Sequence, residues 1–369
     1  MDPKETLRGE SDRLGRLIAF YLPQFHPIPD NDEAWEPGFT EWTNVTRARP
    51  RYPGHPQPHL PRDLGFYDLR NPATLCAQTR LAAEYGIDGF FLYHYWFGGR
   101  RLLGRPLDLI RANKSIRLPF AVCWANENWT RRWHGGDDDV LVHQAHSDLD
   151  DERHGRWLAS LIGDSRYIRL DGAALIGIYK PSLLPHPART AERFRSAAEK
   201  AGTGPIHLTM VESTEWERSV DPLEIGFDSS IDFFPDWTGL GSAQRSLGIR
   251  VRNRLARGAA VYDYAEVAIN RISKPLRADP PRFPCVSPGW DNTPRRSEGA
   301  VVLHGASPVL YERWLTAEAE RVMKADFESP VVFVNAWNEW AEGASLEPSQ
   351  RFGRAFLNST LRSSTRLKP

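Results

Sequence analysis

Eight short runs of apolar, β-branched or aromatic residues, spread along 369 residues, constrain the fold of this chain more than any other feature. Many of them are followed by a segment with helical periodicity, which is typical of alternating strands and helices. The predicted strands cover residues 16–25, 87–96, 119–129, 174–181, 206–213, 227–235, 283–290 and 331–340. The clearest predicted helices cover residues 71–85, 151–163, 188–201, 260–272 and 307–325. Ser307 before Pro308 is the expected N-cap of the last helix.

This alternation predicts an α/β fold, a (β/α)8 TIM barrel whose parallel strands are buried on both faces. A doubly wound open sheet is the alternative, but no glycine-rich phosphate fingerprint follows the first predicted strand. We expect one domain over residues 16–362, between a flexible N-terminal tail (1–15) and a C-terminal tail (363–369). The long connection 26–70 is rich in aromatic residues, which favours a folded lid, whereas the polar connection 236–258 is expected to be mobile.

Composition and charge narrow the class of protein. Hydrophobic residues make up 41% of the chain and charged residues 25%, which is typical of a soluble globular protein. The 47 basic residues balance 47 acidic ones, so the net charge gives no indication of nucleic-acid or anionic-membrane binding. No apolar run reaches the ~20 residues of a membrane-spanning helix, and the polar N-terminus lacks the apolar core of a signal peptide. We therefore expect a cytoplasmic protein.

The cysteines and tryptophans further limit the kinds of protein that this chain can be. Cys76, Cys123 and Cys285 are widely spaced, which argues against a disulfide scaffold and against a zinc cluster. Thirteen tryptophans cluster in polar rather than apolar segments. Sugar rings pack their C–H faces on aromatic rings while their hydroxyls need polar partners. The chain therefore favours an oligosaccharide or polysaccharide as its ligand.

Polar and aromatic side chains follow nearly every predicted strand. In a TIM barrel the carboxyl ends of all strands meet at one mouth, where active sites lie, so we expect these side chains to share one site. They are Gln24, His26, Tyr93, His94, Tyr95, Trp96, Trp124, Asn126, Glu127, Trp129, Tyr179, Lys180, Glu212, Asp232, Trp290, Asp291, Asn338, Glu339 and Glu342.

The last predicted strand ends in NAWNEWAEG, which places Glu339 and Glu342 three residues apart. Glycosidic cleavage needs a proton donor for the leaving oxygen and stabilisation of an oxocarbenium-like transition state, and paired carboxyl groups supply both. Gly343 would allow the turn that brings both into the mouth. Alternatively, one of the two caps the following helix or pairs with an arginine.

Other side chains leave more than one role open. Glu127 either acts as a further site carboxylate or forms an ion pair with Arg131 or Arg132. His26 and His94 either bind sugar hydroxyls or are structural. The acidic stretch GGDDD is more typical of a solvated loop than of a cation site, so we expect no metal. No GxSxG elbow, P-loop or HExxH motif supports a serine hydrolase, an NTPase or a zinc protease.

Five ordered motifs, IAFYLPQFHPIPDND, GFTEWTNV, GIDGFFLYHYWF, WANENWTRRW and NAWNEWAEG, resemble the WbsX-type family. Its members are often labelled glycosyltransferases and occur among genes for bacterial surface polysaccharides. That family is in turn similar to glycoside hydrolase family 99, the endo-α-mannosidases. The resemblance covers roughly residues 16–360 and implies the same (β/α)8 barrel.

The resemblance to family 99 implies roles for the carboxylate pair. Glu339 would be the base that takes the proton of the substrate 2-hydroxyl, which then forms a 1,2-anhydro sugar with overall retention. Glu342 would protonate the leaving oxygen and then activate water, with no metal, nucleotide or other cofactor. The WbsX-type pattern adds a sugar site lined by His26, Tyr93, His94, Trp124, Asn126 and Glu127. Strand ends add the candidates Trp129, Tyr179, Glu212, Trp290 and Asn338.

Two departures from the family pattern affect specificity. His134 stands where an aspartate is expected, and Ala344 and Ser345 follow AEG where a bulkier residue is usual at the second position. Mannose is therefore not carried over. The leading hypothesis is a retaining glycoside hydrolase of bacterial polysaccharide or oligosaccharide. The alternative is a glycosyltransferase or transglycosylase of polysaccharide assembly, and a non-catalytic carbohydrate-binding barrel has less support because both carboxylates are present.

Overall fold

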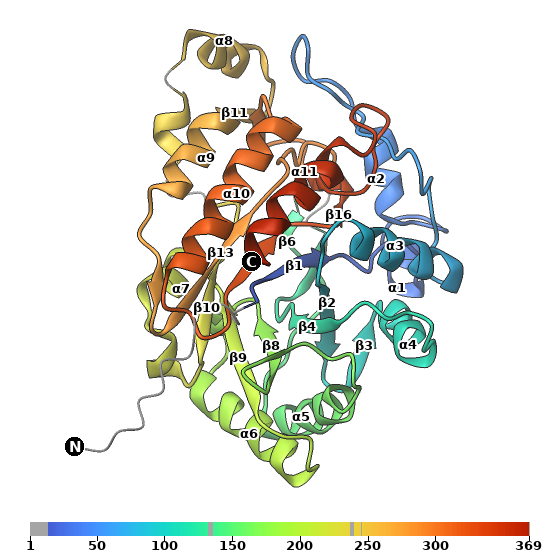
Figure 1. Cartoon of the computed structure of the whole chain (residues 1–369). Coiled ribbons are helices and arrows are strands. Elements are labelled where there is room, and N and C mark those ends of the chain that lie inside the picture. Colours follow the sequence, from blue (N-terminus) through green and yellow to red (C-terminus); the bar gives the residue numbers. More distant parts are fainter. Residues whose placement is uncertain (1–13, 132–135, 237–239, 245, 369) are drawn as a thin grey trace, which may run out of the picture.

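Eight parallel strands close into a barrel at the centre of the molecule, with helices around it (Figure 1). The computed structural model describes residues 14–131, 136–236, 240–244 and 246–368, so residues 1–13 and His134 lie outside the described part. The barrel strands, in the order in which each pairs with the next, are β1 (Arg16–Tyr21), β2 (Gly89–Phe97), β4 (Phe120–Trp124), β8 (Ala173–Ile178), β9 (Ile206–Val211), β10 (Ser229–Asp232), β13 (Pro281–Val286) and β15 (Val331–Val334). β15 pairs back with β1 and closes the ring, which confirms the predicted TIM barrel and its eight strands.

Helices and short strands complete the described part of the fold. The helices are α1 (Pro29–Ala34), α2 (Glu41–Arg47), α3 (Pro72–Glu84), α4 (Arg105–Ala112), α5 (Asp148–Ile162), α6 (Pro187–Lys200), α7 (Glu215–Ser219), α8 (Leu247–Leu255), α9 (Tyr264–Ile272), α10 (Pro308–Lys324) and α11 (Ala355–Ser364). The short strands are β3 (Arg100–Leu102), β5 (Trp129–Arg131), β6 (Gly136–Val142), β7 (Arg169–Leu170), β11 (Ala259–Asp263), β12 (Arg277–Ala278), β14 (Ala300–His304), β16 (Asn338–Glu339) and β17 (Ala344–Ser345). No helix of the described residues is long and apolar enough to span a membrane.

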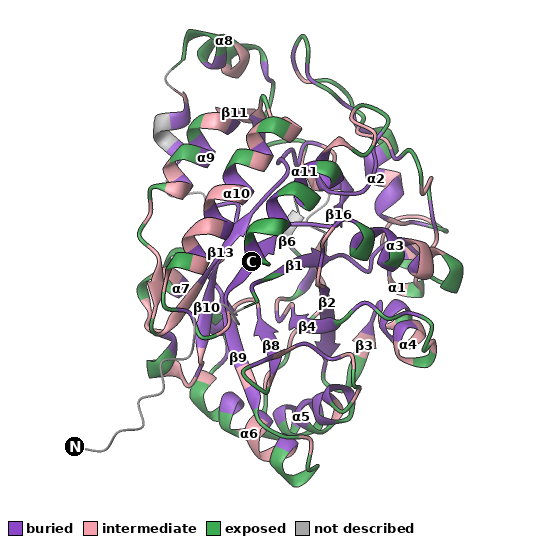
Figure 2. Ribbon diagram, in the orientation of Figure 1, coloured by how far each residue is buried: buried purple, intermediate pink, exposed green. Residues whose placement is uncertain are grey.

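The barrel strands are buried on both faces, as Figure 2 shows. Consecutive side chains on a strand point to opposite faces, so they alternate between the barrel interior and the helices. Phe91 on β2 contacts Phe20 of β1 and Phe333 of β15, whereas Trp96 stacks on His154 of α5. This alternation determines which of the predicted residues face the mouth of the barrel and which face the helices.

Three segments differ from the sequence expectation. The predicted helix 260–272 begins as strand β11, and Asp263 caps the shorter helix α9 by accepting from the N–H groups of Ala265 and Glu266. The connection 236–258 contains helix α8. The predicted C-terminal tail is part of the packed structure up to residue 368, since α11 continues into η7 (Thr365–Leu367), whose Leu367 is fully buried. Ser307 caps α10 as predicted.

The long connection between β1 and α3 is folded, as its aromatic content predicted. Trp42 of α2 packs against Phe25 and Tyr67 and donates its indole N–H to the Tyr67 carbonyl. Its ring also contacts Trp340, which lies beyond the last barrel strand. The connection therefore covers the segment that carries the carboxylate pair.

Candidate active site

The carboxylate pair lies on a small hairpin beyond the last barrel strand. β15 ends at Val334, six residues earlier than the predicted strand, and β16 and β17 then pair with each other. Between them, η6 (Trp340–Glu342) and Gly343, with φ of 62°, make the turn. A Cβ at Gly343 would lie 2.9 Å from the Asp291 Cβ, so only glycine fits without a shift. The predicted turn at Gly343 is confirmed.

Buried hydrogen bonds fix this hairpin to the barrel. The Asn338 side chain accepts from the Leu22 N–H at 2.7 Å and donates to the Leu22 carbonyl at 3.0 Å. Trp340 donates its indole N–H to Glu347, which also accepts from Tyr67. Asn338, expected to bind substrate, instead holds the hairpin against the end of β1.

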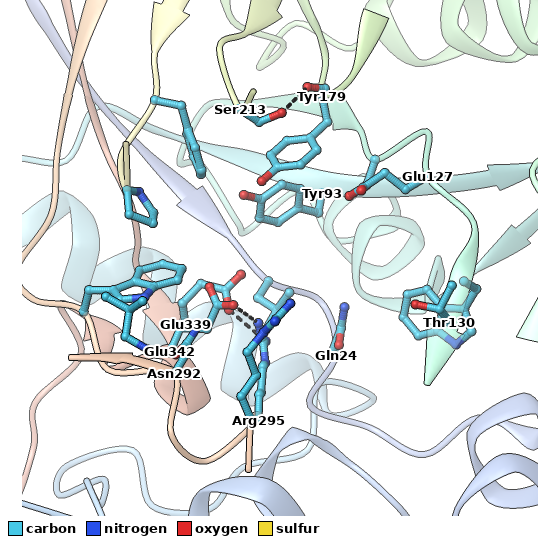
Figure 3. Close-up of a pocket in the computed structure, with 18 of the residues that line it drawn as sticks. Gln24, Tyr93, Glu127, Thr130, Tyr179, Ser213, Asn292, Arg295, Glu339 and Glu342 are labelled. Atoms are coloured by element: carbon cyan, nitrogen blue, oxygen red, sulfur yellow. Dashed lines mark hydrogen bonds and ion pairs between the residues drawn. The ribbon is translucent and has the colours of Figure 1, made fainter. Parts of the chain in front are cut away.

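One arginine holds both carboxylates. Arg295, from the loop after β13, lies 2.9 Å from Glu339 and 2.7 Å from Glu342 (Figure 3). It also lies 2.8 Å from Glu41 of α2, and a different guanidinium nitrogen meets each carboxylate. Glu41 and the two hairpin glutamates thus surround a single positive charge. The cluster therefore has more carboxyl groups than cations, and its side chains are largely buried.

That excess changes the acidity of the pair. Burial, together with the neighbouring Glu342 and Glu41, raises the pKa of Glu339 to about 8, although the Arg295 guanidinium opposes this rise. Burial also raises the pKa of Glu342, with Arg295 again opposing and Glu41 adding to the rise. A buried group of two carboxyls that share one cation favours keeping a proton at neutral pH. The site can therefore both donate and accept protons, as acid–base catalysis requires.

The pair faces a cavity of about 400 Å³ at the mouth of the barrel. Tyr93 and Tyr179 lie opposite Glu339, Glu342 and Arg295 across this space (Figure 3). Of the predicted site residues, those that line the cavity are Tyr93, Glu127, Trp129, Tyr179, Trp290, Glu339 and Glu342. The aromatic side chains among them offer flat surfaces, and the polar ones offer hydrogen bonds, which suits a sugar ring.

Glu127 lines the cavity and pairs with Lys180, which was not a predicted partner. Its carboxylate accepts from the Lys180 ammonium at 2.5 Å, and Lys180 follows strand β8. The predicted alternative partners of Glu127 were Arg131 and Arg132. The Arg131 side chain and the whole of Arg132 lie outside the described residues.

Two predicted residues point to the helices instead. His94 bonds His154 of α5 at 3.1 Å and stacks on Trp157 at 4.3 Å between ring centroids. Trp124 on β4 contacts the same His154 edge to face. Because Tyr93 on the same strand faces the cavity, its neighbour His94 must face away. Neither His94 nor Trp124 lines the cavity.

Three further predicted residues lie away from the cavity. The Asn126 side chain exchanges two hydrogen bonds with the Lys180 backbone. Glu212 accepts a bidentate ion pair from Arg282. His26 is buried, and burial lowers its pKa to about 4, so it is neutral at neutral pH. None of the three lines the cavity.

The cavity also contains residues absent from the predicted site. Arg295, Arg296 and Asn292 lie in the sequence DNTPRR, directly after the strand end at Trp290 and Asp291. Gln24 and Tyr95, noted above as strand ends, also line it and share a hydrogen bond of 2.7 Å. The remaining lining residues are Leu22, Ala125, Asn128, Thr130, Ser213, Phe233, Pro235, Gly299 and Val301. Two arginines beside a strand-end aspartate were a usable signal, whereas the buried Glu41, 254 positions from Arg295 along the chain, gave none.

Within the described residues, no group of three or more His, Cys, Asp or Glu side chains could hold a metal ion. The side chains of Asp137 and Asp138, in the GGDDD stretch, lie outside that part of the chain.

Comparison with known proteins gives two kinds of match. Residues 17–360 match the family described as Glycosyltransferase WbsX. The proteins named Uncharacterized protein WxcX from Xanthomonas campestris pv. campestris, in strain B100 and in a second strain, are 47% identical over 355 residues. The alignments cover 95% of this chain and 50% of those proteins, so the chain spans about half the length of the curated relatives it matches.

Solved structures share the barrel at low sequence identity. A glycoside hydrolase-like protein has a TM-score of 0.60 at 16% identity, over 96% of this chain and 95% of its own. The GH99 endo-alpha-mannosidase from Bacteroides thetaiotaomicron has a TM-score of 0.56 at 16% identity, over 96% of this chain and 97% of its own. At this identity the likeness concerns the fold alone.

Proposed function

The chain belongs to the Glycosyltransferase WbsX family, and from this premise we propose that it is a carbohydrate-active enzyme, a retaining glycoside hydrolase of bacterial polysaccharide or oligosaccharide. One observation carries the proposal. Glu339 and Glu342 face the same cavity, share the Arg295 guanidinium and have raised pKa values. A pair with one proton between them supplies the acid and the base that glycosidic cleavage needs.

The resemblance to family 99 assigns the two side chains separate roles, and the reacting state is the one in which the shared proton lies on Glu342. Glu339 is 5% exposed and lies deeper, whereas Glu342 is 20% exposed. In the proposed first step Glu339 takes the 2-hydroxyl proton, O2 attacks C1, and Glu342 protonates the leaving oxygen as the C1–O bond breaks. In the second step Glu342 takes a proton from water, the water oxygen attacks C1, the C1–O2 bond breaks, and Glu339 returns its proton to O2. C1 is inverted twice, so the product keeps the substrate configuration.

This route sets a requirement on the substrate. O2 must attack C1 from the side opposite to the leaving group, so only a 1,2-trans glycoside with a free 2-hydroxyl reacts. Arg295 supports the route because its positive charge stabilises the carboxylate that forms when Glu342 gives up its proton. The scheme uses no metal or nucleotide.

A transferase is the second candidate, favoured by the description of the family. The same 1,2-anhydro sugar could be opened by a sugar hydroxyl in place of water, which gives transglycosylation with the same two glutamates. A sugar-nucleotide transferase would in addition need a site for a nucleotide diphosphate.

A panel of defined 1,2-trans and 1,2-cis oligosaccharides, with and without nucleotide sugars, tests these candidates by mass spectrometry. We expect 1,2-trans substrates to be cleaved without any nucleotide, with the retained anomer formed first in proton NMR. The 2-O-methyl form of a cleaved substrate should be inert because its O2 carries no proton. Cleavage of that form at an equal rate would exclude the anhydro route, and products that appear only with a nucleotide sugar would exclude the hydrolase.

A further inference from the structure

Helix α8 presents an apolar face to solvent. Leu247, Val251 and Leu255 are 76%, 50% and 48% exposed, and their spacing of four residues places them on one side of the helix. On another side, Ile249 is 2% exposed and packs into a small core with the β11–β14 sheet. Three large apolar side chains adjacent on one exposed helix face mark an interaction surface more often than chance.

Arginines border this apolar face on both sides. At about 100° per residue, Arg250 and Arg254 lie along one edge of the stripe and Arg252 along the other. Arg257 follows the helix, and α8 contains no acidic residue. No carboxylate of the described residues forms an ion pair with these four arginines. The chain as a whole has zero net charge, so this local cluster of positive charge is not apparent from the composition.

The helix is held firmly, so its apolar face is directed outward by the fold. Ser246 caps its N-terminus by accepting from the Ile249 N–H at 3.2 Å. The Asn253 side chain donates to the Val261 carbonyl and accepts from the Val261 N–H, both at 2.7 Å. Figure 1 shows α8 at the edge of the molecule, and Figure 2 shows most of its surface as exposed.

α8 also lies beside the rim of the active-site cavity. The Arg51 guanidinium donates to the carbonyls of Arg257, just after α8, and of Ser297. Ser297 follows Arg296, which lines the cavity. β11, which follows α8 in the chain, pairs with β14, whose Val301 is also in the cavity wall.

We propose that α8 docks on the surface of an anionic phospholipid membrane and so holds the cavity mouth next to that surface. Short amphipathic helices with apolar side chains on one face and arginines at its edges bind in the interface between lipid headgroups and acyl chains. Leu247, Val251 and Leu255 enter that interface, and the arginines meet lipid phosphates. A second copy of the chain is the poorer fit, because a symmetric contact through α8 would oppose arginines to arginines.

Co-sedimentation of the full chain with vesicles tests this docking. We expect binding to mixed phosphatidylcholine and phosphatidylglycerol vesicles, weakened by salt, and little binding to phosphatidylcholine alone. The triple variant Leu247→Gln, Val251→Gln, Leu255→Gln should lower the partition coefficient at least about tenfold while keeping a good helix former at each position. The double variant Arg250→Gln, Arg254→Gln should lower it about thirtyfold, at about 1 kcal/mol for each arginine.

A matched triple variant distinguishes binding through α8 from non-specific binding through other exposed apolar side chains. Leu149, Leu223 and Val309 are 56%, 58% and 60% exposed and lie in other elements, and their change to glutamine should leave vesicle binding unaltered. Equal binding to neutral vesicles, equal loss in the matched variant, or no binding at all would overturn the proposal. So would a fall in oligomeric mass of the α8 triple variant in sedimentation velocity without lipid, which would identify a second copy as the partner.

Discussion

Two clusters of arginine and carboxylate flank the same barrel, and they have opposite balances of charge. In the first, Arg295 is the one cation among the described residues that forms ion pairs with Glu41, Glu339 and Glu342. In the second, the acids Glu212, Asp232 and Asp236 are met by four cations, Arg218, Arg271, Lys274 and Arg282. The first cluster lines a cavity, and the second lies between strands β9, β10 and β13 and helices α7 and α9.

This difference in charge balance distinguishes the cluster proposed to react from the cluster that holds strands and helices together. Glu339 and Glu342 are buried, share one cation and have raised pKa values, which suits the proton exchange proposed for them. In the second cluster Glu212 forms a bidentate ion pair with Arg282, which also pairs with Asp232. Both kinds follow barrel strands in the sequence, so the ratio of cations to carboxylates in each cluster distinguishes them. The same substitution, glutamate to glutamine, therefore has opposite consequences in the two clusters.

The largest effect is expected in the first cluster. Glu339→Gln and Glu342→Gln should each lower kcat by roughly 10²–10⁴-fold, because an amide neither takes nor gives the proton. Stability at neutral pH should be kept, since the change removes a carboxyl from a crowded acidic site. Initial rates on a cleaved oligosaccharide and thermal melting measure the two effects. A fully active Glu342→Gln enzyme would refute the assigned roles.

The second cluster should respond in the reverse way. Glu212→Gln leaves the largely buried Arg282 with only part of its counter-charge, and breaking such a pair costs about 3 kcal/mol. We expect a lower free energy of unfolding in urea and a kcat close to that of the parent protein at temperatures where the variant is folded. Loss of activity without loss of stability would mean that Glu212 acts in the site after all.

The smallest effect tests the balance of charge in the first cluster itself. Glu41 raises the pKa of both Glu339 and Glu342, so Glu41→Gln should lower both pKa values. The general acid then loses its proton at a lower pH. We expect the alkaline limb of the kcat/KM profile to move down by about one pH unit. Glu36→Gln is the matched control, because Glu36 lies in the same connection but pairs with Arg47 at the surface.

An unmoved alkaline limb in Glu41→Gln, or an equal shift in Glu36→Gln, would contradict the role of Glu41. A purely structural role would lower stability and kcat at all pH values and leave the shape of the profile unchanged. The shift in pH dependence is therefore the measurement that decides.

The five motifs predicted the family, and the match over residues 17–360 confirmed it. The barrel was predictable because each of its strands is a separate apolar run, and β8, β9 and β10 stand almost where the pattern placed them. The candidate site was predictable in part. Tyr93 and Trp290 reach the cavity, but His94 and Glu212 do not, because being near a strand end does not fix the face to which a side chain points.

The sequence by itself determined the local features of this protein: the eight strands, the turn at Gly343 and the spacing of Glu339 and Glu342. These depend on neighbours in the chain and on periodicity, which a sequence records directly. The tertiary structure alone decided that Glu41 and Arg295, far apart in the chain, meet at the pair and set its charge. It also decided that the apolar residues of α8 stay exposed, because burial depends on which surfaces the fold brings together.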